Sequence, residues 1–125
     1  MRFLMLVKHA ENQGPPPKAL MEAIGQLAEE DKKAGKNMVA AGGLAPTAMG
    51  ARVRLSGGEI KVLDGPFTEA KEVVGGYAQF EFNTKQEAID SALKFMELHK
   101  KHWPGWVGET EIRQMLAPGE MPKTA

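Results

Sequence analysis

The segment RFLMLVK at residues 2–8 constrains the fold of this chain most, because both of its alternating sets of side chains are apolar. In a β-strand, successive side chains point to opposite faces of the sheet, so this pattern predicts a strand that is covered on both sides. We therefore expect a central strand with neither face left in water. The two sets are Phe3, Met5 and Val7 on one side, and Leu4 and Leu6 on the other.

Two amphipathic helices are predicted. Residues 18–34 carry apolar side chains at steps of three and four residues, and Gly35 ends the pattern. The second helix follows Asn83, where Thr84 and Glu87 have the spacing of a capping box. Its expected buried stripe is Ala88, Ile89, Ala92, Leu93 and Met96.

Strands account for most of the remaining ordered segments. Residues 37–44 predict a short strand that breaks at Gly42-Gly43, residues 75–83 a half-buried strand, and residues 109–116 a last strand. Residues 51–64 predict a hairpin closed by Gly57-Gly58. The expected cross-strand pairs are Leu55 with Ile60, Val53 with Val62, and Arg54 with Lys61.

This order of elements predicts an α+β fold, with a ferredoxin-like antiparallel sheet and two helices on one face. A two-fold dimer that stacks sheet on sheet is the simplest cover for the other face, which gives a dimeric α+β barrel. If Tyr77, Gln79 and Glu81 share that face with Glu111 and Arg113, the space between the sheets is a pocket with a polar wall. We expect one domain at residues 1–116 and a polar C-terminal tail at residues 117–125.

The amino-acid composition excludes several classes of function. Sixteen basic residues balance 16 acidic ones, so the positive field of a nucleic-acid binder is not expected. Without cysteine, thiolate metal sites and thiol chemistry are excluded. The apolar run at residues 3–7 is too short for a signal-peptide core or a membrane span, which predicts a cytoplasmic protein without a membrane partner. The sequence requires no cofactor.

The loop after the hairpin holds the first candidate site residues. Asp64 ends a strand before Gly65-Pro66, so its carboxylate is expected either to accept the backbone N–H of Phe67 or to take part in proton transfer. His9 follows the central strand, and an imidazole is the readiest base at neutral pH. It is either a strand-end histidine or the catalytic partner of Asp64.

Substrate-binding residues are predicted around this pair. The charges from Thr68 to Glu72 fit a solvated turn, whereas in a binding site Arg54 and Lys71 would hold an anionic group. Phe67 is expected to fasten the loop to the core, and it is also a candidate contact for substrate. Tyr77 and Arg113 complete the set if they line the pocket between the sheets.

The segment HKKHWPGW at residues 99–106 is a candidate metal site, because it contains two histidines. His99 and His102 are three residues apart, but a zinc site needs a third ligand, and none is clearly placed nearby. Basic residues in the last turn of a helix are instead explained by its negative end. We predict no metal site, and a packed loop or dimer contact for Trp103 and Trp106.

The run DGPFTEAKE at residues 64–72 resembles the DGPF-motif branch of the YCII-related family. The preceding GARVRLSGGEIKVL and the later GGYAQFE and EIRQ extend the resemblance over roughly residues 1–115. It implies a dimeric α+β barrel of ferredoxin-like subunits. In short YCII proteins a His and Asp pair is the proposed acid and base, with its His in the first helix, whereas residues 18–34 contain no His. The branch is also associated with extracytoplasmic-function sigma factors.

Two functions are predicted from these observations. In the first, a homodimer binds a small organic molecule and uses His9 and Asp64 for general acid-base proton transfer. In the second, the chain is a non-catalytic module that senses a metabolite or regulates a partner through its dimer surface, in the context of sigma-factor regulation. The placement of His9 relative to Asp64 distinguishes them.

Overall fold

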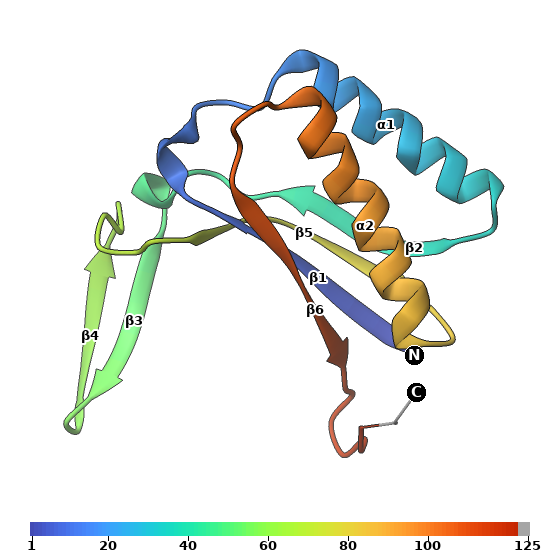
Figure 1. The fold of residues 1–125 in the computed structure, drawn as a ribbon. Helices are drawn as coiled ribbons and strands as arrows, with labels where there is room; N and C mark the ends of the chain where they lie inside the picture. The colour runs from blue at the N-terminus through green and yellow to red at the C-terminus, as the bar shows by residue number, and fades with distance from the viewer. Residues whose placement is uncertain (123–125) are drawn as a thin grey trace.

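A computed structural model describes residues 1–122 and has two layers, a sheet and a pair of helices (Figure 1). The strands of the sheet are β1 (Arg2–His9), β2 (Asn37–Gly43), β5 (Val73–Glu81) and β6 (Gly108–Met115). The helices are α1 (Lys18–Lys33) and α2 (Lys85–His102). Strands β3 (Ala51–Ser56) and β4 (Glu59–Asp64) form a separate hairpin, and short 3₁₀ turns lie at η1 (Glu11–Gln13) and η2 (Thr47–Met49).

The main sheet is antiparallel, with the strand order β2-β5-β1-β6. Strand β1 therefore lies between β5 and β6, which confirms the prediction of a central strand. Both helices lie on one face of this sheet (Figure 1). Without the hairpin, the elements follow one another as β-α-β-β-α-β, the order of ferredoxin-like folds. The predicted α+β class is confirmed.

The hydrophobic core lies between the sheet and α2. Phe3 and Met5 of β1 and Phe80 of β5 are buried there against Ala88 and Ala92 of α2. Because opposite residues of antiparallel strands share a face, the register of β1 with β5 brings these side chains together. The predicted stripe of α2 was wrong at Leu93, which is 56% exposed. Ser91 and His99 are buried on the same helix.

The helix ends follow the predicted signals. At α2, the backbone N–H of Glu87 donates to Thr84 Oγ1 at 3.2 Å. The Glu87 carboxylate accepts from the backbone N–H of Asn83 at 2.9 Å, so the reciprocal bond of the capping box goes to the residue before the cap. Helix α1 ends at Lys33, and Gly35 follows with a φ of 78°, a conformation that favours glycine.

The hairpin has the predicted register but does not join the main sheet. Val53 pairs with Val62, Arg54 with Lys61, and Leu55 with Ile60, and Gly57 and Gly58 at the turn have φ values of 60° and 78°. The two strands project from the body of the subunit as an arm (Figure 1). We call residues 51–64 the arm. After β6, residues 117–122 contain a turn, and the rest of the predicted tail lies outside the described residues.

Candidate functional site

The face of the sheet that points away from the helices is the first candidate site, and we call it the open face. Leu6 of β1 pairs with Tyr77 on one side and Glu111 on the other. Leu4 pairs in the same way with Gln79 and Arg113. Paired residues share a face, so the polar side chains of β5 and β6 flank an apolar centre on β1. Tyr77 and Gln79 therefore share a face with Glu111 and Arg113, which the sequence had left open.

Charged groups form a network along one side of the open face. Lys8 Nζ lies 3.1 Å from Glu111 and 3.5 Å from Glu109, and Arg113 lies 3.2 Å from Glu111. The hydrogen bond from Lys8, followed by that from Arg113, lowers the pKa of the Glu111 carboxyl. The same bond to Glu111 raises the pKa of Lys8. Glu111 thus holds two cations of the open face in place.

Tyr77 extends from β5 across the neighbouring strand β2. Its pairing partner there is Gly42, and a Cβ at this position would lie 3.3 Å from both the Tyr77 ring and its hydroxyl oxygen. A larger residue than glycine would therefore press against the ring, so Gly42 leaves it the room to lie over β2. The tyrosine is 37% exposed, and its hydroxyl is at the edge of the open face.

The loop after the arm, residues 65–72, packs against η2, and we call this contact the joint. The backbone N–H of Phe67 donates to Thr47 Oγ1 at 3.2 Å, so the expected bond to the Asp64 carboxylate was wrong. The geometric reason is that η2 brings the Thr47 hydroxyl to this N–H, while Asp64 is exposed. Gly65 packs against Thr47, and its backbone N–H donates to the Gly50 carbonyl at 2.9 Å.

Two further groups hold this joint together, and neither was predicted. The guanidinium of Arg52 lies 3.8 Å from the centre of the Phe67 ring and 2.7 Å from the Glu69 carboxylate. The Glu11 carboxylate accepts from the Thr47 hydroxyl and from its backbone N–H, and these bonds lower the pKa of Glu11. Arg52 could have been identified from the hairpin register, because it is the arginine nearest the arm's base. Glu11 gave no sequence signal.

The remaining candidates from the sequence lie on or near the arm. Arg54 is exposed on the arm. The pKa of the Glu69 carboxyl is lowered most by a backbone hydrogen bond at Glu69, less by Arg52, and least by the charge of Arg54. Lys71 is exposed in the loop that follows. Phe67 contacts Arg52 and is half-buried, which agrees with a residue that fastens the loop.

His9 lies at the end of β1 among aromatic side chains. Its Nδ1 is 3.0 Å from the carbonyl oxygen of Ala10, and its ring lies 6.3 Å from that of Trp106. A Cβ at Gly75 would overlap the imidazole, so this glycine makes room for the ring. Within residues 1–122, no hydrogen bond or ion pair joins His9 to Asp64. The imidazole of His9 is therefore held by Ala10 and Gly75 and not by Asp64.

The histidines at the end of α2 are not alike. His99 is buried, with its ring centre 4.4 Å from that of Trp106 and its Nδ1 3.0 Å from the Phe95 carbonyl oxygen. Burial lowers the pKa of His99. Trp103 and Trp106 are 5.9 Å apart in the same cluster, which agrees with a packed loop. No group of three metal-binding side chains occurs among the described residues.

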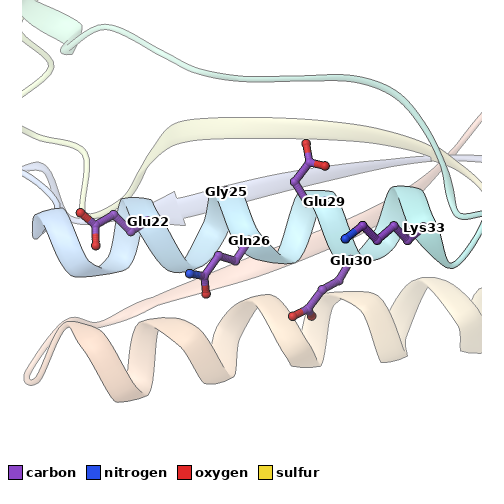
Figure 2. A pocket seen from close by; sticks show the side chains of 6 residues that line it. All are labelled: Glu22, Gly25, Gln26, Glu29, Glu30 and Lys33. Carbon is purple, nitrogen blue, oxygen red and sulfur yellow. The ribbon is translucent and has the colours of Figure 1, made fainter.

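The hollows on the helical side do not involve the predicted site residues. One lies on the outer surface of α1, where Gly25 has no side chain to fill the space between its neighbours (Figure 2). Every lining residue comes from this helix, so the hollow is a dent in a solvated surface. Its lining residues are Glu22, Gly25, Gln26, Glu29, Glu30 and Lys33. A second hollow lies where the ends of α1 and β5 approach the start of α2.

Comparison with known proteins agrees with the sequence resemblance. The model of the YCII-related domain matches residues 1–102, which contain every element from β1 to α2. The chain belongs to the YCII-related domain family. This YCII-related chain is also 35% identical over 81 residues to an uncharacterized protein of Rhizobium meliloti (strain 1021). That match covers 63% of this chain and 61% of the relative, so the chain spans less than two thirds of the relative's length.

The family match ends before β6. Arg113 and Glu111 of the open face therefore lie outside the matched range, whereas Tyr77 and the joint at the base of the arm lie inside it. Helix α1 has no histidine, which is the departure from short YCII proteins noted above. Among the described residues, no helix is long and apolar enough to cross a membrane.

Proposed function

We propose that this YCII-related protein is a homodimer that binds a small organic molecule on the open face of its sheet. The observation that carries the proposal is the register of β1 with both neighbours, which gathers Tyr77, Gln79 and Arg113 around Leu4 and Leu6. Binding sites for small molecules are mostly apolar, with a few polar groups that fix the ligand's orientation. The open face has this composition.

A second copy of the chain is the proposed cover. Leu4 and Leu6 are only half-buried in one subunit, although they belong to a central strand. An antiparallel sheet can face water on one side, but its exposed residues are then polar, and here the middle of the face is apolar. Two open faces related by a two-fold axis would enclose a chamber with an apolar floor and polar sides.

The ligand that best fits this face has an apolar body and an anionic group. The apolar part would lie on Leu4, Leu6 and the ring of Tyr77. Arg113 is 70% exposed and uses one nitrogen for Glu111, which leaves other N–H groups for a carboxylate. Lys8 is already held by two carboxylates, so we assign the anion to Arg113.

The catalytic prediction remains separate from this proposal. Proton transfer between His9 and Asp64 would require the two groups to come within hydrogen-bond reach of one substrate. The imidazole of His9 is instead engaged at the Ala10 carbonyl and lies against Gly75. We therefore propose binding as the function. Catalysis, a regulatory role linked to sigma factors and a cytoplasmic location stay predictions.

Thermal-shift measurements with matched ligand pairs test the binding site. We expect benzoate or hexanoate to raise the melting temperature of the wild type more than the neutral benzyl alcohol or 1-hexanol does. The difference should disappear in Arg113→Gln and persist in Arg54→Gln, an exposed arginine on the arm. Loss of the difference in Arg54→Gln alone would place the anion at the arm and refute the assignment.

A further inference from the structure

The arm has one apolar face and one polar face. Val53, Leu55, Ile60 and Val62 are directly opposed in pairs, so all four side chains lie on the same side of the hairpin. In one subunit they are 69–71% exposed, although each is a large hydrophobic residue. The other side presents Arg54, Lys61, Ser56 and Glu59.

Such an exposed apolar face indicates an interaction surface. Isolated two-stranded hairpins are at best marginally stable in water, and they gain stability by packing an apolar face on another element. Within residues 1–122, the arm leaves the body of the subunit and does not fold back over the helices or the main sheet (Figure 1). Large contiguous apolar patches on a surface mark sites where another molecule binds.

The base of the arm is fixed, which supports docking by a preformed element. Arg52 contacts the ring of Phe67 and the carboxylate of Glu69. The backbone N–H of Gly65 donates to Gly50, and the Thr47 hydroxyl accepts from Phe67. These contacts hold the direction of the arm without covering its apolar face. An element that is already ordered loses less entropy when it binds.

The apolar face of the arm is too small to form a stable interface by itself. A stable interface typically buries about 800 Å² on each partner, and four aliphatic side chains supply only part of that area. The contact must therefore extend from the arm to another surface of the subunit. The arm projects on the side of the sheet opposite the helices (Figure 1). The arm and the open face therefore border the same space.

We propose that each arm lays its apolar face on the second copy of the chain, so that the two arms form part of the wall of the ligand chamber. This inference rests on the homodimer of the proposed function and adds the arm to its interface. A two-fold pair offers the open face and the arm on both subunits, so each contact occurs twice. The charged side of the arm then remains in water, where Arg54, Lys61 and Glu59 discourage further association.

Sedimentation over a dilution series of the full chain tests the proposal. The double variant Leu55→Ser with Ile60→Thr should raise the dimer dissociation constant at least tenfold. The matched variant Arg54→Ser with Lys61→Thr, on the same strands but the polar side, should leave it within about threefold. Because Leu55 and Ile60 are about 70% exposed in one subunit, the change should leave the circular dichroism spectrum intact.

Crosslinking gives a second measurement in a chain that has no cysteine of its own. With a maleimide benzophenone, Leu55→Cys should yield covalent dimers on illumination, and Arg54→Cys should yield far fewer. A dimer that the apolar variants do not weaken would refute the role of the arm while leaving the proposed homodimer intact. A monomeric wild type at micromolar concentration would overturn both, and would leave the arm to a partner of another kind.

Discussion

Gly65 is the residue at which a single methyl group should cost this fold most. A Cβ at this position would overlap the carbonyl oxygen of Thr47 and lie 2.6 Å from its carbonyl carbon and 3.2 Å from the Ala48 nitrogen. All three are backbone atoms, so no side-chain rotation relieves the overlap. Gly65→Ala must therefore move η2 away from the loop after the arm.

The magnitude follows from what this movement disturbs. Overpacking of a well-packed position costs about 1–3 kcal/mol. The displacement also threatens the bond from Phe67 to Thr47 and the bonds from Thr47 to Glu11, at about 1 kcal/mol for each bond that is lost. We expect the free energy of unfolding to fall by about 2–4 kcal/mol, because solvent competes for the exposed bonds. For a chain of this size that corresponds to a melting temperature lower by roughly 10 °C.

Urea unfolding followed by tryptophan fluorescence measures the change, with Trp103 and Trp106 as reporters next to α2. Gly25→Ala is the matched control, because a Cβ there meets no atom within 4 Å and the residue lies in the middle of α1. It should stabilise the chain by about 0.5–1 kcal/mol, the helix preference of alanine over glycine. If the free energy of unfolding of Gly65→Ala lies within about 0.5 kcal/mol of that of the wild type, Gly65 is not packed against the backbone of Thr47.

Three further predictions concern α2. Burial lowers the pKa of His99 below its usual 6.5, so the unfolded chain takes up the proton first; stability should fall as the pH drops below about 6.5, and less steeply in His99→Gln. Thr84→Ala removes the bond to the backbone of Glu87 and should cost about 1 kcal/mol in urea unfolding. Ala88 is 0% exposed in the core, so Ala88→Leu should cost about 1–3 kcal/mol by overpacking.

Each of these has an outcome that contradicts it. An unchanged pH dependence in His99→Gln would show that another group controls acid stability. For the cap, Thr84→Ser keeps the hydroxyl, so equal losses in the serine and alanine variants would exclude the hydrogen bond as the cause. A stabilised Ala88→Leu variant would show unfilled space between α2 and the sheet.

Much of the fold could be predicted because it depends on local patterns. The apolar side chains on both faces of residues 2–8 indicated a central strand, and the paired glycines at 57 and 58 set the hairpin register. The cap at Thr84 followed from its spacing to Glu87. Each signal lies within a few residues, where the period of the side chains or the conformation of glycine decides the structure.

The candidate site could be predicted only in part. The sequence left open whether Tyr77 and Arg113 share a face, because side-chain periodicity does not say which strands are neighbours or in what register they pair. The role of Asp64 as a cap was wrong because Thr47, 20 residues away from Phe67, supplies the acceptor. The burial of His99 was missed for a similar reason, since Trp106 packs on it from beyond the helix end.

Sequence alone determined the order of strands and helices, the turn of the arm and the apolar character of both sides of β1, since these depend on neighbouring residues. Tertiary structure decided that the arm leaves the sheet, that Arg52 and Thr47 meet Phe67, and that His9 and Asp64 are not bonded to each other. These contacts join segments that the chain brings together only on folding. Their geometry depends on packing between whole elements rather than on any local pattern.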